Sequence, residues 1–446
     1  MPRPITRAAR AALAAIAAAT IVAGLAACGG GSSNDKGEVV ITCVSCQASP
    51  TDPSLQHIYD TAQAFNKKYA GKYRVKTVKS QNAGSSADRL QYYQRLALAN
   101  DLPDIFQVNT EELRSLAKTG KLMNFAPELQ KDAAWKGSFN DGAFAALTGQ
   151  GGEVWAIPET RDAIGIYYNK AIFKSAGVAA FPQTWTDFEA DCAKIKAVGK
   201  TCFAMDGDWV TLLTWANLIG TQPGGAAFLN GGIRSGDYST NPVVVKATET
   251  LKRWHTDGFI NANAFSGEYQ NAATQFISGK AAMIANGPWM VNSDIKTKNA
   301  VKGLYGEIGY EESPGWSAGQ RGLIIVSGEG SYASGAHDAR KQEAVTAFMK
   351  FMTSHGQALA QVRVEGAWPA VKFAPTPAEK KTLEPLATAL VSRSTSVPLT
   401  YPHPYYNAPA PLQTAWRNLW PAYVKSGESP GDFLGKLSKQ AQSATG

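Results

Sequence analysis

The chain has 446 residues, of which 44% are hydrophobic and 18% are charged, and its formal net charge is +8. This composition excludes a disordered chain, and the length suffices for two or three domains, each with its own core. The positive charge is not clustered into a basic stripe with interleaved aromatic residues, which argues against nucleic acid as a partner.

The first 27 residues carry the pattern of an export signal. Three arginines precede an apolar run that ends at Gly24. The Leu-Ala-Ala-Cys that follows resembles the lipobox of bacterial lipoproteins, which predicts cleavage before Cys28 and attachment of lipid to it. Residues 28–37 read as a flexible tether. We therefore expect an exported protein anchored by lipid to the outer face of the cell membrane, because no later stretch reaches the roughly 18 apolar residues of a membrane span.

Four further cysteines follow Cys28. We favour a disulfide between Cys192 and Cys202, which lie on a predicted helix end and the strand after it. Cys43 and Cys46 form a CxxC motif at the end of the first predicted strand. A local disulfide or a structural thiol pair fits this motif better than redox catalysis, because residues 47–53 separate it from the next helix. No histidine lies at zinc-ligand spacing nearby, and we expect no metal and no cofactor.

Strands and helices alternate along the first part of the chain. The predicted strands are residues 38–44, 73–78 and 103–106, and the predicted helices are residues 55–69, 88–99 and 110–118. This alternation predicts an α/β fold with a mostly parallel sheet, whose ligands bind beyond the carboxyl ends of the strands. The loops at those ends make Gln47, Asn109 and Glu111 candidates for polar ligand contacts.

The stretch GGEVWAIPETRDAIGIYYNK, residues 151–170, contains two strand-like segments separated by a polar break. Four charged or hydroxylated residues follow Pro158, too many to bury within one continuous strand without partners. We interpret the break as a crossover between two lobes. Residues 158–160 would form the hinge, and Arg161 and Asp162 would lie at the mouth of the cleft. A surface β-hairpin corner is the alternative.

Two later landmarks carry a resemblance to a known family. YYNKAIFKSAGV is followed by FPQTWTDFEADCAKIK, and FISGKAAMI is followed by NGPW. In this order and separation they resemble the sugar-binding lipoproteins of bacterial ABC importers, the family 1 extracellular solute-binding proteins that include maltose-binding protein. The resemblance implies a two-lobed periplasmic-binding-protein-like fold with three interlobe crossings and a ligand cleft between the lobes. The first lobe would be residues 38–157 plus 314–352, and the second lobe would be residues 158–313 plus 353–446. The third crossing would lie at residues 353–356.

The same resemblance suggests ligand contacts in the middle of the chain. Asp208 and Trp209 follow the predicted strand 201–204. Trp289 follows a Gly-Pro turn, where its ring offers a flat apolar face to a sugar, although a core anchor is the alternative. Trp316 and Arg321 lie at the second crossing implied by the family pattern.

Further candidates lie toward the C-terminus. Trp368 stands where most members of the family carry a smaller residue, so it is either an extra sugar platform or a packing residue. Tyr405, Tyr406 and Asn407 belong to an aromatic turn restricted by prolines. Related proteins place ligand contacts near this turn, and a surface loop is the alternative.

The function implied by the resemblance is capture of a carbohydrate, such as an oligosaccharide, and its delivery by hinge closure to the permease of an ABC importer. We expect a monomer without catalytic residues. One alternative is a binder of a polyamine or glycerophosphodiester, because aromatic rings attract cations and Arg161 with Arg321 suits an anion. Another is an extracellular glycoside hydrolase that uses Asp162 and Asp208.

Overall fold

The computed structural model describes residues 37–49, 53–79, 86–235, 238–297, 299–327, 330–386, 388–389 and 397–443. Nearly all of them belong to one unit, Glu38–Gly446, which is distinct from Met1–Gly37. The expected signal peptide, Cys28 and most of the expected tether lie outside the described residues. Within the described part of the chain, no helix has the length and apolar character that crossing a membrane requires.

The strands are β1 (Val39–Cys43), β2 (Tyr73–Thr77), β3 (Phe106–Val108), β4 (Ala156–Pro158), β5 (Arg161–Asn169), β6 (Thr201–Ala204), β7 (Ala281–Asn286), β8 (Ile308–Glu311), β9 (Gly322–Ser327), β10 (Ser331–Ala333) and β11 (Leu399–Pro402). The longer helices are α1 (Pro53–Lys68), α2 (Ser86–Leu98), α3 (Thr110–Ala117), α7 (Trp185–Ala197), α8 (Trp209–Gly220), α11 (Pro242–Thr256), α12 (Tyr269–Ile277), α13 (Ala339–Met352), α14 (His355–Val364), α18 (Ala410–Lys425) and α19 (Pro430–Gln442). Shorter helical turns are α4 (Ala126–Lys131), α5 (Ala133–Gly137), η2 (Ala145–Leu147), α6 (Lys170–Ser175), α9 (Gly225–Ala227), η3 (Phe228–Gly232), α10 (Ile233–Ser235), η4 (Val291–Ile295), η5 (Leu304–Glu307), α15 (Pro377–Lys380) and α17 (Pro404–Asn407).

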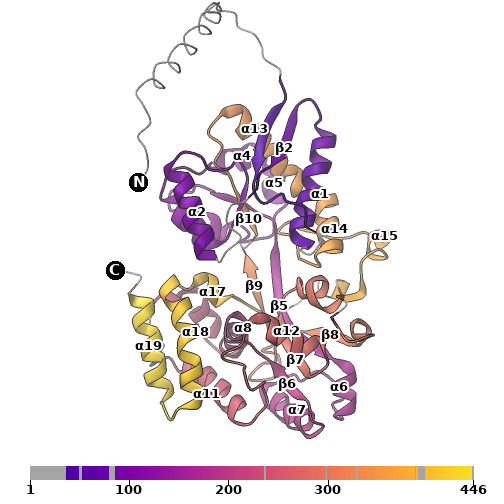
Figure 1. Ribbon diagram of the computed structural model, residues 1–446, viewed down its shortest axis with the longest axis vertical. Coiled ribbons are helices and arrows are strands. Elements are labelled where there is room, and N and C mark those ends of the chain that lie inside the picture. The colour runs from indigo at the N-terminus through magenta and orange to yellow at the C-terminus, as the bar shows by residue number, and fades with distance from the viewer. Residues whose placement is uncertain are drawn as a thin grey trace, which may run out of the picture. The chain divides into compact units, whose positions relative to one another are not determined.

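The first lobe is built on two small sheets (Figure 1). β1 and β2 pair in parallel, and β10 lies between β3 and β4, antiparallel to both. In β2 the side chains alternate between buried Tyr73 and Val75 and exposed Arg74 and Lys76, because successive side chains of a strand point to opposite faces. The apolar face of α1, which includes Phe65, packs with α13 and α14 in the same core.

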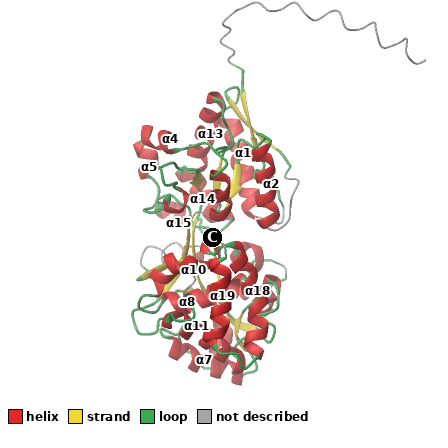
Figure 2. Cartoon of the chain, turned by 90° about the vertical axis from the view of Figure 1, so that its left-hand side faces the viewer, coloured by secondary structure: helices red, strands yellow, loops and turns green. Residues whose placement is uncertain are grey.

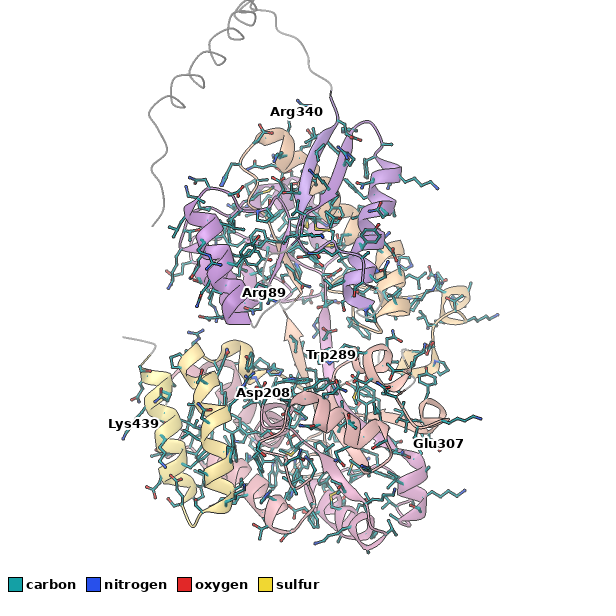
Figure 3. The ribbon with its side chains drawn as sticks, in the orientation of Figure 1. Arg89, Asp208, Trp289, Glu307, Arg340 and Lys439 are labelled. Atoms are coloured by element: carbon teal, nitrogen blue, oxygen red, sulfur yellow. A yellow bond between two sulfur atoms is a disulfide. The ribbon has the colours of Figure 1, made fainter. Side chains whose placement is uncertain are left out.

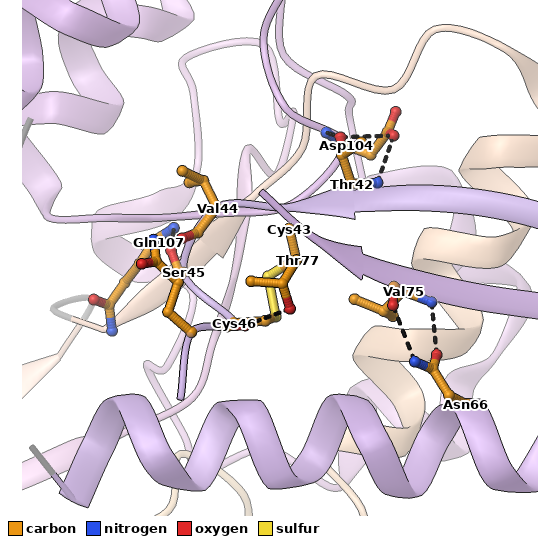
Figure 4. Close-up of a disulfide and its surroundings, with 11 residues drawn as sticks. Thr42, Cys43, Val44, Ser45, Cys46, Asn66, Val75, Thr77, Asp104 and Gln107 are labelled. Atoms are coloured by element: carbon orange, nitrogen blue, oxygen red, sulfur yellow. Dashed lines mark hydrogen bonds between the residues drawn. A yellow bond between two sulfur atoms is a disulfide. The ribbon is translucent and has the colours of Figure 1, made fainter. Parts of the chain in front are cut away.

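A disulfide between Cys43 and Cys46 closes the loop that follows β1, with an S–S distance of 2.04 Å (Figure 4). The Thr77 hydroxyl donates to the carbonyl of Cys46 at 2.7 Å, which fixes this loop against the end of β2. On α1, the amide of Asn66 donates to the carbonyl of Val75 and accepts from its N–H. The carboxyl end of β1 is therefore held in place by its neighbours.

The second lobe contains a six-stranded sheet in the order β11-β9-β5-β7-β6, with β8 paired to β5. The long strand β5 pairs with β9 along its first half and with β7 and β8 along its second. Helices flank the strands (Figure 2). The structure contains the expected disulfide between Cys192 of α7 and Cys202 of β6, with an S–S distance of 2.00 Å. Trp185, Trp215 and Trp254 are buried in this core.

The first strands pair in parallel as expected, since β1 pairs with β2 and Cys43 bridges to Ile105, but most later strands do not. β5 is antiparallel to all three of its partners, and the β3-β10-β4 sheet is antiparallel throughout. Among the described strands, the parallel pairs are β1–β2, β6–β7 and β9–β11. The alternation of strands and helices indicated an α/β fold correctly. It does not predict the direction of a strand that returns from the other lobe.

The packing of two segments also differs from the expected lobe assignment. β9 pairs within the second sheet, although residues 314–352 were expected in the first lobe. The helix α14 packs against α1 and buries Leu359 and Val362 in the first core, although residues 353–446 were expected in the second lobe. Leu383 still belongs to the first core and Leu386 to a cluster with β7 and β8. The third crossing is therefore not at 353–356, because the apolar face of α14 is buried in the first lobe.

Candidate ligand-binding site

Two segments of chain run side by side where the lobes meet. Thr160 bridges to Pro369 as in an antiparallel ladder. The N–H of Arg161 donates to the carbonyl of Trp368 at 2.8 Å, and the N–H of Ala370 donates to the carbonyl of Glu159 at 2.9 Å. These backbone bonds fix residues 159–162 at the centre of the molecule. Their side chains are therefore placed by the backbone of both segments.

A cavity of about 450 Å³ lies beside these segments, and we call it the central pocket. Its lining residues are Ser54, Arg89, Gln107, Val108, Asn109, Glu159, Thr160, Asp162, Asp208, Trp209, Trp289, Gly330, Glu365, Ala367, His403, Tyr405 and Arg417. Figure 3 shows Arg89, on the first lobe, above Asp208 and Trp289, which belong to the second. The pocket thus takes side chains from both lobes.

Aromatic rings form one wall of the central pocket. The ring centroids of Trp209 and Trp289 are 6.0 Å apart, and Trp209 stacks on Tyr269 at 4.8 Å. The Tyr269 hydroxyl donates to Asp294 at 2.7 Å. A Cβ at Gly287 would come within 2.1 Å of the Trp289 ring, so only glycine leaves room for this ring position. Trp209 and Trp289 are half-buried, which leaves part of each ring available to a ligand.

The turn before α8 positions Asp208 and Trp209. One carboxylate oxygen of Asp206 accepts N–H groups of Asp208, Val210 and Thr211 at 2.9, 3.0 and 3.2 Å, in place of the missing helical partners. Asp208 in turn forms a two-point ion pair with Arg417 of α18, whose Nε lies 2.8 Å from Oδ1. This pair presents a carboxylate and a guanidinium together at the pocket.

The first lobe supplies a second arginine and an amide. Nε and Nη2 of Arg89 donate to the two oxygens of Glu112 at 2.7 and 3.0 Å. Glu112 also completes a capping box with Asn109 at the start of α3, where the Asn109 side-chain oxygen accepts the N–H of Glu112 at 2.8 Å. The cap holds Asn109 at the pocket with its amide nitrogen as the remaining donor of the side chain.

Two buried carboxyl groups lie on the crossover. Burial, against the Tyr332 hydroxyl and with the nearby Asp162 acting in the same direction as burial, raises the pKa of Glu159 to about 8. Burial also raises the pKa of Asp162 to about 7, against the backbone N–H of Trp368 and the Thr160 hydroxyl. Near neutral pH these groups exchange between an acceptor-only carboxylate and a protonated form that also donates. Burial lowers the pKa of His403 to about 3, so its imidazole is neutral.

Six of the fourteen expected ligand contacts lie together in the central pocket. They are Asn109, Asp162, Asp208, Trp209, Trp289 and Tyr405. Arg161 lies on the opposite side of β5, where it lines a separate cavity of about 340 Å³. Because neighbouring residues of a strand point to opposite faces, Asp162 alone of this pair reaches the central pocket. The side chains of Tyr406 and Asn407 lie outside the described residues.

The other five expected contacts do not line the central pocket. Gln47 donates to the Val44 carbonyl at 2.8 Å, which makes it part of the β1 loop. Glu111 pairs with Arg234 at 3.0 Å. Gln47 and Glu111 are therefore engaged elsewhere, whereas Asn109 of the same strand-end loop as Glu111 lines the pocket.

Trp316, Arg321 and Trp368 serve the packing of the second lobe and the crossover. The Trp316 indole donates to the Leu218 carbonyl at 2.8 Å, and a lysine Nζ lies 3.5 Å from its ring centroid. Arg321 pairs with Glu311 and Glu312 at 2.8 and 2.6 Å. Trp368 is only 5% exposed, and its backbone holds the crossover. Two roles were expected for Trp368, a sugar platform or a packing residue, and its buried position agrees with packing.

Several pocket residues escaped the sequence analysis. Glu159 and Thr160 were noticed only as part of a hinge. Arg89, Glu365 and Arg417 lie on helices or helix ends, where a charged residue is usually exposed to solvent and no local motif distinguishes them. Their helical spacing alone could have placed them on an exposed face, but not beside this pocket.

Comparison with known proteins identifies the family. The family model described as bacterial extracellular solute-binding protein matches residues 49–359. The chain belongs to this family. This solute-binding protein is 25% identical over 357 residues to the diacetylchitobiose binding protein DasA of Streptomyces coelicolor, which covers 77% of each chain. It is 27% identical over 226 residues to the multiple sugar-binding protein of Streptococcus mutans, which covers 49% of this chain and about half, 52%, of that one.

Solved structures show the same two-lobed α/β fold. A chitin oligosaccharide binding protein superposes with a TM-score of 0.74 at 20% identity and covers 91% of this solute-binding protein and 98% of its own chain. RafE in complex with raffinose gives a TM-score of 0.70 at 22% identity, with coverage of 92% and 100%. The fold expected from the sequence is confirmed. The family consists of binding proteins and not of enzymes, and it is an extracellular one.

Proposed function

We propose that this solute-binding protein captures a carbohydrate in the central pocket and delivers it to the permease of an ABC importer. The observation that carries the proposal is the pairing of half-buried aromatic rings with carboxyl, guanidinium and amide groups in one cavity between the lobes. A sugar ring has apolar C–H faces that stack on Trp209 or Trp289, and hydroxyl edges that bind Asp208 and Arg417. Two relatives, a multiple sugar-binding protein and a diacetylchitobiose binding protein, support the same ligand class.

The polar side chains favour a neutral, hydroxyl-rich ligand over an anion. Both arginines of the central pocket are already neutralised, Arg89 by Glu112 and Arg417 by Asp208. Arg161 and Arg321, which would suit an anionic solute, do not line this pocket. Ion pairs that present both charges at a surface can donate to and accept from sugar hydroxyls without a change in net charge.

The N-terminal part of the proposal concerns the cell envelope. Export, cleavage before Cys28 and lipid attachment there would hold a monomer at the outer face of the membrane, close to the permease. Mass spectrometry of the protein from cells would show the lipid on an N-terminal Cys28, and a Cys28→Ser variant would be released into the medium. An unmodified Cys28 in membrane-bound protein would contradict the anchor.

Isothermal titration calorimetry tests the ligand class. The panel contains chitin, xylan and maltodextrin oligosaccharides, raffinose, a polyamine and a glycerophosphodiester. We expect binding of a sugar, and we expect Trp289→Ala to weaken it by about 10–100-fold, because an aromatic ring covers on the order of 100 Å² of ligand at about 25 cal/mol per Å². Trp316→Ala, which removes a tryptophan outside the pocket, is the matched control and should leave affinity unchanged.

Two outcomes would contradict the proposal. Binding of the polyamine or the glycerophosphodiester without any sugar would replace the ligand class. Conversion of an oligosaccharide into shorter products during the titration would indicate a glycoside hydrolase and not a binder.

A further inference from the structure

Three side chains from distant parts of the sequence converge behind the central pocket. His57 lies on α1, Glu159 between β4 and β5, and Glu365 at the C-cap of α14. One ring nitrogen and one oxygen from each carboxyl group all lie within 4.8 Å of one another. The three residues are 3%, 9% and 5% exposed, so the cluster is buried.

The backbone that carries these side chains is fixed on all sides. Helices α1 and α14 pack together, and the Thr61 hydroxyl donates to the Gln357 side chain between them at 2.9 Å. The Glu159 carbonyl accepts the N–H of Ala370 at 2.9 Å. The cluster therefore joins a helix of the first lobe to the two segments that run side by side where the lobes meet.

Glu159 has an unsatisfied oxygen in this buried place. The Tyr332 hydroxyl donates to its carboxyl group, but Oε1 is buried and has no hydrogen-bond partner among the residues that the structure describes. A buried carboxylate oxygen without a partner costs free energy comparable to a lost hydrogen bond. A cation would supply what Oε1 lacks.

We propose that His57, Glu159 and Glu365 form a binding site for a divalent cation of the zinc or manganese class. An imidazole nitrogen together with two carboxylate oxygens suits these ions, whereas magnesium and calcium prefer oxygen ligands alone. Two carboxylates and a neutral imidazole balance the charge of one such ion. Ligands about 2.1 Å from zinc lie roughly 3.4 Å apart, so binding requires only a small inward movement of the side chains.

The cation site takes a different ligand from the proposed sugar site, but the two sites share a wall. Glu159 and Glu365 also line the central pocket, which gives the ion a path from solvent. The bound ion would tie α1 to the crossover. No motif spacing in the sequence reveals the site, because its three ligands come from separate elements.

Zinc titration into chelator-treated protein, followed by calorimetry in the absence of any sugar, tests the site. We expect one ion per chain, and we expect His57→Gln to weaken zinc binding by at least about tenfold. Cobalt(II) provides a second readout, since its visible absorption changes when a histidine and carboxylates surround it. Glu159→Gln should weaken zinc binding to a similar degree, and it serves as the test if circular dichroism shows that His57→Gln does not fold.

His355 provides the matched control, because it is half exposed and lies beside Glu379 on the surface at 3.0 Å. We expect His355→Gln to bind zinc as the unmodified protein does. Absence of stoichiometric zinc binding, or equal affinity in the unmodified protein and in His57→Gln, would overturn the site. A sugar titration of the metal-free protein reports separately on the proposed function.

Discussion

Arg161 and Asp162 are neighbours in the sequence with different surroundings. Both were expected at the mouth of the cleft because they follow Pro158 in a polar break. They are instead the first two residues of β5, paired with Ser327 and Val326 of β9. Strand geometry turns Asp162 into the central pocket and Arg161 into the cavity on the other side. The sequence could identify the pair as unusual, but only the strand boundary decides which residue meets the ligand.

The raised pKa of Asp162 predicts a pH-dependent stability. Its folded pKa of about 7 exceeds the ordinary value of 3.8, so the folded protein keeps a proton that the unfolded chain releases between these values. This contribution to the free energy of unfolding is complete below pH 3.8 and is lost as pH rises through 7. The side chain of Asp162→Asn stays neutral at both pH values. The Tm of this variant should therefore exceed that of the unmodified protein by more at pH 8 than at pH 5.

The gain should amount to several degrees, since 1 kcal/mol shifts Tm by about 2–4 °C in domains of the size of one lobe. Calorimetric melting of both proteins at the two pH values measures it. Asp141→Asn is the control, because Asp141 is exposed and its lysine partner lies 3.5 Å away. An Asp162→Asn difference that does not change between pH 5 and pH 8 would contradict the buried, protonated state.

At the scale of elements, local patterns predict helices and strands well when one face is apolar. The strand expected at residues 201–204 is β6, and the helix expected at residues 110–118 is α3. The pairing of those elements is not local. β5 is antiparallel to β7, β8 and β9, and α14 belongs with α1, because burial of apolar faces at long range decides both. The composition of the central pocket could not be predicted for the same reason, because Arg89 and Arg417 reach the pocket only through tertiary packing.

The two disulfides predict different effects on stability. Cys192 and Cys202 are ten positions apart, whereas Cys43 and Cys46 are three apart. A longer closed loop restricts the unfolded chain more, so loss of the α7–β6 disulfide should cost about 2.5–3 kcal/mol, and loss of the other roughly 1.5 kcal/mol. Urea unfolding of the two double Cys→Ala variants measures both costs. A larger loss for the Cys43 and Cys46 variant would contradict this order.

At the scale of the whole molecule, the central pocket is divided between two bodies. Arg89 and Asn109 belong to the first lobe, and Asp208, Trp289 and Arg417 belong to the second. A ligand that touches both sets stabilises whichever arrangement brings them together, and it shifts the population by its difference in affinity for the two states. We propose that the lobes rotate about the antiparallel segments that pair at Thr160 and Pro369.

Small-angle X-ray scattering would detect this closure as a decrease in the radius of gyration when the sugar found by calorimetry saturates the protein. Trp316→Ala should close like the unmodified protein, because its tryptophan packs outside the pocket. Trp289→Ala should need a sugar concentration about 10–100-fold higher for the same decrease, in step with its weaker binding. If the radius of gyration stays constant at saturation, the ligand binds without closure, and the permease would have to recognise the occupied protein by some other feature.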